Sequence, residues 1–149
     1  MATVYDGIAG QWQEYRGKPR MFLIAPALKK LGKNWAVLDA GCGNAANARE
    51  LALRCRAVAC LDNSREMLEY AKKNLEGVEN AETVFGSMTL LPFDAESFEA
   101  VTCTAAFHHL NARERKKAAK EFWRVLKPGG RLFATLWRPR GHGKWGLVK

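Results

Sequence analysis

Short apolar runs alternate along the chain with segments in which apolar residues recur every three or four positions. A short continuous apolar run is typical of a strand buried in a parallel sheet, whereas the wider spacing is typical of an amphipathic helix. We therefore predict strands at residues 35–40, 57–61, 81–85, 98–104 and 131–137. Because helical segments lie between them, the pattern predicts an α/β fold: a mainly parallel, Rossmann-like sheet of about five strands with flanking helices.

Helices are predicted between the strands from apolar spacing and from residues that favour helix ends. We expect helices over residues 20–32 and 45–54. Ser64 is a suitable N-cap for a third helix. Asn111, with Glu114 three residues later, has the spacing of a capping box that begins a fourth helix.

The length and composition are those of one folded domain. The chain has 149 residues, of which 48% are hydrophobic and 26% are charged, and this excludes wholesale disorder. We expect a single domain in three parts: an N-terminal helical cap at 1–34, a core at 35–137 and a basic tail at 138–149.

Further composition signals narrow the class of protein. No uninterrupted apolar run approaches the roughly 20 residues of a membrane span, and the N-terminus lacks the pattern of a secretory signal. We therefore expect a cytoplasmic protein without a membrane anchor. The four cysteines are scattered, without a C-x-x-C pair, so we expect reduced thiols and no metal site.

Positive charge is concentrated toward the two ends of the chain. The formal net charge is +9, and residues 113–149 carry twelve Lys and Arg against two Asp and Glu, whereas residues 57–112 are acidic. Such a distribution is typical of a protein that faces a polyanion such as a nucleic acid. A solvated lysine-rich helix face with a basic tail would produce the same distribution.

A glycine turn follows the first predicted strand. Gly41 and Gly43 come directly after the apolar run, where the backbone can approach a ligand and a helix begins. About twenty residues later, Asp62 ends the second strand, and a carboxylate there can accept two hydrogen bonds from a ribose diol. Gly-x-Gly alone also occurs in ordinary tight turns, so the predicted site for a ribose-containing ligand depends on the pairing with Asp62.

Four segments together resemble the class I S-adenosylmethionine-dependent methyltransferases: VLDAGCG at 37–43, DNS at 62–64, LPF at 91–93 with SFEAV at 97–101, and LKPGGRL at 126–132. The resemblance implies the strand order 3-2-1-4-5 and a core at 35–137 that binds S-adenosylmethionine. It places Asp39, Gly41 and Gly43 at the methionine part of the cofactor and Asp62 at its ribose. Asn63, Ser87 and Met88 are placed at the adenine, and Thr104 lies under the sulfonium. The implied cofactor-binding residues are Asp39, Gly41, Cys42, Gly43, Asp62, Asn63, Ser87, Met88 and Thr104.

The sequence departs from this family at two places. Ser87 stands where the family usually has a carboxylate that accepts a hydrogen bond from the adenine amino group, and a hydroxyl makes a weaker bond. Ala45 or Ala46 stands where the family tends to have a third glycine. We therefore expect reduced cofactor affinity, unless backbone or water supplies the adenine contact. We also expect the glycine loop to lie slightly further from the ligand.

Segments outside the cofactor motifs resemble, more narrowly, the tRNA methyltransferases that esterify carboxymethyluridine at the wobble position. These segments are residues 8–9, 16–19 and 108–116 and the tryptophan at the end of the fifth strand, although Arg20 replaces the tryptophan that the family has after the proline. The resemblance implies tRNA as a partner. The implied catalytic residues are His108, His109 and Arg113, and the implied substrate-binding residues are Arg16, Arg115 and Trp137.

These residues also have structural interpretations, and the function has alternatives. The two histidines can pack against or cap the next helix, the arginines can lie in a solvated first turn, and the tryptophan can belong to a core or an interface. A small-molecule methyltransferase and a catalytically silent cofactor-binding subunit are the alternative functions.

The chain stops just after the fifth predicted strand, where the family's sheet usually continues with an antiparallel strand pair. Without that pair, the apolar strand at 131–137 would be an edge, which natural proteins seldom leave bare. The strand at 81–85 is half polar and is expected at the other edge, where it is available for strand addition. We therefore expect a partner, either a second copy of the chain or a small zinc-binding activator, unless residues 139–149 cover the edge.

Overall fold

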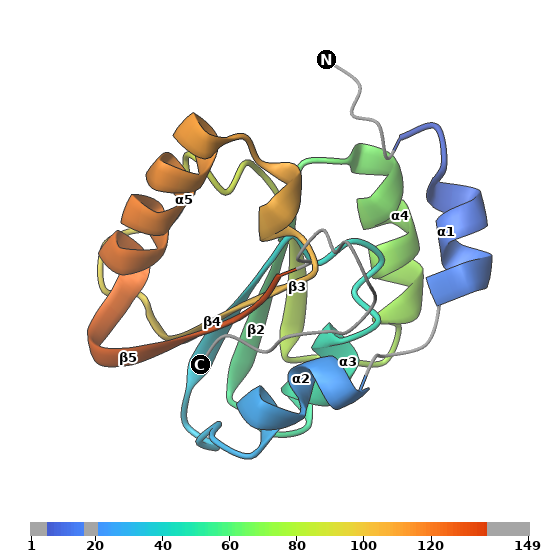
Figure 1. Ribbon diagram of the computed structural model, residues 1–149. Helices are drawn as coiled ribbons and strands as arrows, with labels where there is room; N and C mark the ends of the chain where they lie inside the picture. The colour runs from blue at the N-terminus through green and yellow to red at the C-terminus, as the bar shows by residue number, and fades with distance from the viewer. Residues whose placement is uncertain (1–5, 17–20, 137–149) are drawn as a thin grey trace.

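The computed structural model describes residues 6–16 and 21–136, and this part of the chain contains a five-stranded sheet. All neighbouring strands are parallel, in the order β3-β2-β1-β4-β5 (Figure 1). The predicted α/β fold and strand order are therefore confirmed. The strands are β1 (Ala36–Ala40), β2 (Ala57–Asp62), β3 (Ala81–Phe85), β4 (Phe98–Thr104) and β5 (Leu126–Thr135).

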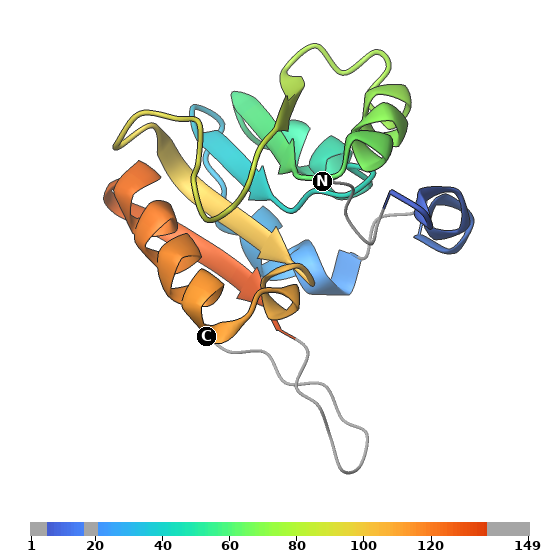
Figure 2. The same ribbon diagram turned by 90° about the horizontal axis from the view of Figure 1, so that it is seen from above.

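Helices cover both faces of the sheet (Figure 2). Apolar side chains of α2, α3 and α4 form one buried cluster with the sheet, and α5 forms a second cluster with its opposite face. Because side chains alternate along a strand, Val37 of β1 joins the first cluster and Leu38 the second. In the described part of the chain, no helix has the length and apolar character to cross a membrane. The helices are α1 (Ala9–Arg16), α2 (Met21–Leu28), α3 (Ala48–Ala52), α4 (Arg65–Asn74), the 3₁₀ helix η1 (Phe107–His109) and α5 (Ala112–Val125).

Both predicted N-caps are present. Ser64 Oγ accepts a hydrogen bond from the backbone N–H of Met67 at 3.1 Å. Asn111 and Glu114 form a reciprocal capping box, in which each side chain accepts from the other residue's N–H, at 3.0 and 2.8 Å. This box fixes the start of α5 directly after η1.

Two predicted helices are shorter than expected. The segment 45–54 contains only the five helical residues of α3, because Ala45 has φ +57° and its left-handed backbone turns the chain before the helix begins. The segment 20–32 is helical only as far as Leu28. There the N–H of Lys30 bonds three residues back to the carbonyl of Ala27, a tighter turn that ends the α-helix.

The fifth strand begins at Leu126, earlier than the predicted start at residue 131. Phe98 of β4 pairs with Leu126 and Ala100 pairs with Arg131, so residues 127–130 bulge out while pairing continues on both sides. Gly129, with φ +76°, supplies the left-handed backbone of this bulge. The Pro-Gly-Gly sequence at 128–130 therefore interrupts a strand. Position 137, the predicted end of this strand, lies outside the described residues.

The two edges of the sheet are β3 and β5, as expected. Each edge strand exposes a large apolar side chain: Phe85 is 49% exposed and Leu132 is 47% exposed. Within residues 6–16 and 21–136, no strand pairs with the outer side of β5. Both edges are therefore open in this part of the chain.

Candidate functional site

The carboxyl ends of β1, β2 and β4 meet where the strand order reverses between β1 and β4. Ligands of open α/β sheets bind in the crevice beyond such strand ends. The connections that leave these three strands carry most of the predicted cofactor residues: 41–47 after β1, 62–64 after β2 and 104–106 after β4. The fold therefore brings the glycine turn and Asp62 to one place.

The two glycines of the turn are required for different reasons. Gly41 has φ +73° and Gly43 has φ +56°, both in the left-handed region that favours glycine. A Cβ atom at Gly41 would lie 2.5 Å from the Cβ of Ala106, so the loop after β4 packs directly on this residue. At Gly43 no atom would lie within 4 Å of an added Cβ, so the chain leaves open space there for a ligand.

Asp62 is held against the glycine turn by backbone hydrogen bonds. The N–H of Gly43 donates to Asp62 Oδ2 at 2.8 Å, and the N–H of Ser64 donates to Oδ1 at 2.9 Å. Burial raises the pKa of Asp62, while hydrogen bonds from the backbone oppose that rise. Because each carboxylate oxygen can accept more than one hydrogen bond, this oriented group still has acceptor capacity for a hydroxyl ligand.

Asp39 is a second carboxylate beneath the same turn. It is 2% exposed, and the hydroxyl of Thr102 donates to its Oδ1 at 2.8 Å. Burial raises the pKa of Asp39 to about 6; the hydrogen bond from Thr102 opposes this rise, and the charge of Asp62 adds to it. The site therefore holds two carboxylates close enough to affect each other, an arrangement that attracts a cationic ligand at neutral pH.

Cys42 lies in the turn between the two glycines and is partly buried. A hydrogen bond with the neighbouring Cys60 thiol, followed by burial, raises the pKa of Cys42 well above its ordinary value. The thiol therefore stays protonated and does not act as a nucleophile near neutral pH. Its contribution to the site is packing and shape.

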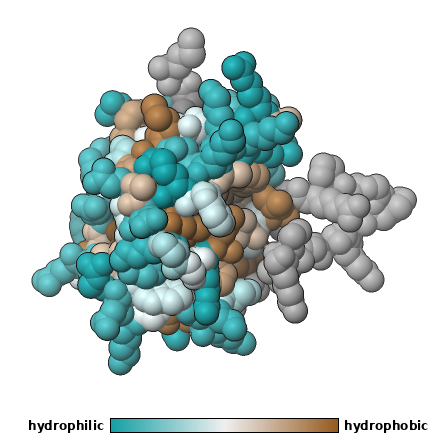
Figure 3. Space-filling model, turned by 90° about the vertical axis from the view of Figure 1, so that its left-hand side faces the viewer, coloured by the Kyte–Doolittle hydropathy of each residue, from teal (hydrophilic) through white to brown (hydrophobic). Residues whose placement is uncertain are grey.

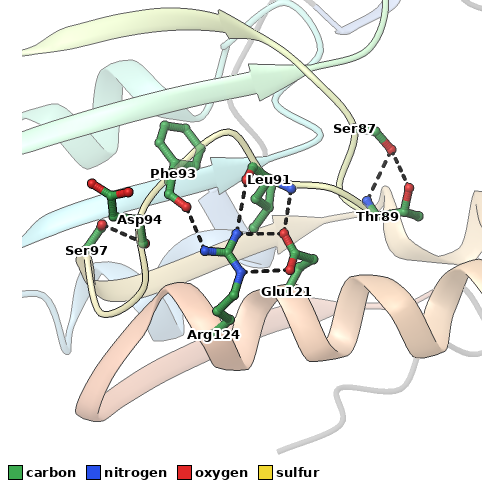
Figure 4. A network of polar contacts seen from close by, with 8 residues as sticks. All are labelled: Ser87, Thr89, Leu91, Phe93, Asp94, Ser97, Glu121 and Arg124. Atoms are coloured by element: carbon green, nitrogen blue, oxygen red, sulfur yellow. Dashed lines mark hydrogen bonds and ion pairs between the residues drawn. The ribbon is translucent and has the colours of Figure 1, made fainter.

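Met88 reaches the glycine turn from the connection that follows β3. Its methyl carbon would lie 3.6 Å from a Cβ at Gly41, and its sulfur accepts a hydrogen bond from Cys103 Sγ at 3.7 Å. Ser87 Oγ instead lies 2.8 Å from the hydroxyl oxygen of Thr89 and accepts from the Thr89 N–H at 3.1 Å (Figure 4). The Ser87 hydroxyl is thus engaged within its own turn.

Asn63 and Thr104 occupy the strand ends on either side of the turn. Asn63 is exposed directly after β2, and Thr104 is the half-buried last residue of β4, opposite Thr135 of β5. Both stand at the same end of the sheet as the glycine turn.

The two predicted histidines and two of the three predicted arginines lie on η1 and in the first turn of α5, beside this end of the sheet. His108 and His109 belong to η1, with ring centroids 4.1 Å apart, and His109 is the more exposed of the two. Arg115 Nε donates to the carbonyl of Leu110 at 2.7 Å, which ties the first turn of α5 to η1. Arg113 is exposed in that turn. The Arg16 side chain and Trp137 lie outside the described residues.

An ion pair on α5 holds the connection between β3 and β4, and the sequence did not reveal it (Figure 4). Glu121 Oε2 accepts from the N–H of Leu91 at 2.7 Å. Arg124 donates to the carbonyls of Phe93 and Leu91 at 2.7 and 3.0 Å, and it also forms a two-bond ion pair with Glu121. We call Glu121 and Arg124 the α5 clamp. The only local signal was an acid and a base three positions apart on the helix.

A cluster of side-chain amides holds the other side of the glycine turn and was also missed. Asn44, which is 4% exposed, donates from Nδ2 to Gln13 Oε1 of α1 at 2.7 Å. Asn74 of α4 donates to the carbonyl oxygen of Asn44 at 2.8 Å. The turn is therefore attached to two helices besides the sheet. No group of three or more potential metal ligands occurs among the described residues.

A family model described as a methyltransferase domain matches residues 37–130, which run from β1 into the β5 bulge. The chain belongs to the S-adenosylmethionine-dependent methyltransferases. The predicted family and its cofactor, S-adenosylmethionine, are thereby confirmed.

Two curated relatives act on different kinds of molecule. A demethylmenaquinone methyltransferase of Clavibacter sepedonicus is 40% identical over 96 residues, which cover 64% of this chain and 38% of the relative. A tRNA (carboxymethyluridine(34)-5-O)-methyltransferase of Arabidopsis thaliana is 34% identical over 137 residues, which cover 90% of this chain and 31% of the relative. The chain thus spans roughly a third of the length of these methyltransferases.

A solved structure with the same fold is the complex between the Haloferax volcanii Trm112 methyltransferase activator and a methyltransferase. Its TM-score is 0.79 at 24% sequence identity, and the match covers 91% of this chain and 61% of that chain. At this identity the similarity establishes the fold.

The residues of the site fit S-adenosylmethionine. The open surface at Gly43 would give its amino-acid part access to the backbone, and Asp62 would accept hydrogen bonds from the ribose diol. Met88, which lies against the glycine turn, would offer an apolar surface to the adenine. The two carboxylates, Asp39 and Asp62, complement the positive charge of the sulfonium methyl donor.

The affinity for S-adenosylmethionine is expected to rise between pH 5 and pH 7 and to level off above pH 7. With a pKa of about 6, Asp39 is mostly neutral at pH 5, and protonation removes a negative charge that favours the cationic ligand. Since roughly one Asp39 in ten remains ionised at pH 5, the affinity falls up to about tenfold. Titration calorimetry at both pH values measures this, and Asp39→Asn should flatten the profile. An equally steep profile in that variant would assign the pH dependence to another group.

Proposed function

We propose that this chain transfers the methyl group of S-adenosylmethionine to tRNA, onto the carboxylate of a carboxymethyluridine-type nucleotide. The extent of similarity supports this acceptor. The match to the Arabidopsis tRNA enzyme covers 137 residues, whereas the family model covers 37–130 and the match to the Clavibacter enzyme covers 96 residues. The cofactor core is common to methyltransferases with many acceptors, so similarity outside that core is the more informative part.

A carboxylate acceptor suits the groups that surround this site. When bound, S-adenosylmethionine supplies an activated methyl group, which a carboxylate oxygen accepts in line without first losing a proton. The protein therefore has to position two reactants and exclude water, and it needs no dedicated base. In this proposal Arg113 pairs with the acceptor carboxylate or a neighbouring phosphate, and His108 and His109 line the acceptor side.

Methyl transfer to bulk tRNA is the direct test. With labelled S-adenosylmethionine and a Trm112-type activator supplied, label is expected in the tRNA and is expected to be released by mild alkali, because a methyl ester is base-labile. The rate at sub-saturating tRNA should fall steeply between 50 and 200 mM salt, because salt weakens the nucleic-acid affinity of proteins that contact several phosphates. Base-stable label would refute the ester, and the absence of label despite cofactor binding would refute tRNA as acceptor.

A small-molecule acceptor is the second candidate, because the Clavibacter demethylmenaquinone enzyme has the higher identity, 40% over its matched residues. Salt separates the two candidates: turnover of an uncharged small acceptor should change little with salt. A catalytically silent subunit would bind the cofactor and transfer methyl to neither acceptor.

We further propose that an open sheet edge receives a partner, either a small activator protein or a second copy of the chain. Leu132 on β5 and Phe85 on β3 offer apolar contacts beside unpaired strand backbone, and edge strands favour pairing with another chain. The Haloferax methyltransferase of the same fold was solved with its Trm112 activator, which supports the activator as the first partner to supply.

A further inference from the structure

The outward face of α5 carries a row of cations. Arg113, Lys116, Lys117 and Lys120 follow one another at spacings that place them on one side of the helix, and all four are exposed. The buried apolar residues of α5 lie on its opposite side, against the sheet. We call these four residues the α5 basic row.

No carboxylate in the described part of the chain forms an ion pair with this row. The two acids of α5 are engaged elsewhere: Glu114 in the capping box and Glu121 in the α5 clamp. Figure 3, which looks at the side of the molecule that carries α5, shows a mostly hydrophilic surface there. The row therefore presents several uncompensated positive charges to solvent, where a polyanion can reach them.

Trp123 continues the same side of α5 toward its C-terminal end. It follows Lys120 by three residues, and its side chain is 84% exposed. Such exposure is unusual for an indole, which normally gains stability from burial. Exposed aromatic rings beside cations are also the surfaces on which proteins stack unpaired bases.

The basic row begins beside the candidate site. α5 starts directly after η1, and the hydrogen bond from Arg115 to the Leu110 carbonyl holds these two elements together. From Arg113 to Trp123 the helix rises about 15 Å, at 1.5 Å per residue. That length is comparable to a few nucleotides of a nucleic-acid strand. A strand lying along the row would therefore reach the end of the sheet where the cofactor residues gather.

We infer that the α5 basic row and Trp123 form a docking surface for the RNA strand that carries the acceptor nucleotide. The cations contact successive phosphates, and Trp123 stacks on an unpaired base away from the methylated one. This inference rests on the proposed function, since it assigns the route by which tRNA reaches that site. It adds a surface that the cofactor motifs do not contain.

Binding of bulk tRNA to the full chain tests the inference. A triple variant is expected to weaken tRNA binding at least tenfold at 50 mM salt. It combines Lys116→Gln, Lys117→Gln and Lys120→Gln. The slope of log Kd against log salt should fall by about 2 to 3, because each lost phosphate contact removes somewhat less than one released counterion. Trp123→Ala is expected to weaken binding between about fivefold and a hundredfold with an unchanged salt slope.

A matched triple variant separates a specific surface from general charge. The control variant combines Lys29→Gln, Lys30→Gln and Lys33→Gln. It removes the same charge from exposed positions between α2 and β1, at the far end of the sheet. This control should change the Kd by less than about threefold, and S-adenosylmethionine affinity should be unchanged in both triples. Equal losses in the two triples, or no loss in either, would overturn the docking surface.

The failure of this inference can be told apart from the failure of the proposed function. If the unmodified chain methylates tRNA and the α5 variants bind tRNA as tightly as it does, the docking surface is wrong and the function stands. If the unmodified chain binds S-adenosylmethionine but neither binds nor methylates tRNA, both are wrong.

Discussion

Asp62→Ala is expected to weaken S-adenosylmethionine binding at least a hundredfold. The substitution removes the proposed acceptor for the ribose diol and also the group to which the N–H groups of Gly43 and Ser64 donate. Hydrogen bonds to a charged group contribute about 1.5–3 kcal/mol each, so the loss of two ligand bonds alone accounts for that factor. Release of the glycine turn adds to the loss.

Titration calorimetry with S-adenosylmethionine and with its demethylated product measures this effect. Asp62→Asn retains one acceptor oxygen and the shape of the side chain, so it should bind S-adenosylmethionine more tightly than the alanine variant does. It is the variant to measure if Asp62→Ala does not fold. Asp94→Asn, on the exposed part of the connection to β4, is the matched control and should bind normally. An Asp62→Ala variant that folds and binds within about fivefold of the unmodified chain would remove Asp62 from the site.

The strands could be predicted because their signal is local. Each buried strand is a short apolar run, so its position is visible in the sequence alone. The strand order depends on pairing between distant segments, and the family resemblance supplied it. The errors arose where the backbone departs from the conformation that local propensity favours. The chain turns at Ala45 instead of continuing a helix, and residues 127–130 bulge because β4 pairs on both sides of them. Local propensity for helix or turn does not report such constraints.

The candidate site was predictable to the same limited extent. The glycines and Asp62 follow strand ends, and that placement is visible in the sequence. The close approach of Ala106 to Gly41 is not, because it joins two loops far apart in the chain. The α5 clamp is invisible for a further reason: its partners are mostly backbone atoms about thirty residues away, at Leu91 and Phe93. Backbone acceptors place no demand on residue type.

Arg124→Ala is expected to lower both the stability of the protein and its affinity for S-adenosylmethionine. Arg124 fastens the connection that carries Met88, through two carbonyls and through Glu121, which itself holds the N–H of Leu91. Removal leaves Glu121 without its cation and frees the connection, at a cost of about 1–3 kcal/mol in the free energy of unfolding. Because Met88 lies against the glycine turn, the apolar surface that it would offer to adenine is expected to become less well positioned. Denaturant unfolding and titration calorimetry measure the two effects.

Removal of another ion pair distinguishes positioning of the site from a general loss of stability. Lys127→Ala breaks the ion pair with Glu99 at the opposite end of the strands, where no cofactor residue is predicted. It should lower stability and leave cofactor affinity unchanged, whereas Arg124→Ala should weaken the affinity by roughly fivefold to fiftyfold even where the protein is fully folded. Arg124→Lys should restore part of the stability and little of the affinity, because one ammonium cannot reproduce the planar fork that spans the Leu91 and Phe93 carbonyls. Equal affinities in the Arg124 and Lys127 variants would limit the clamp to a structural role.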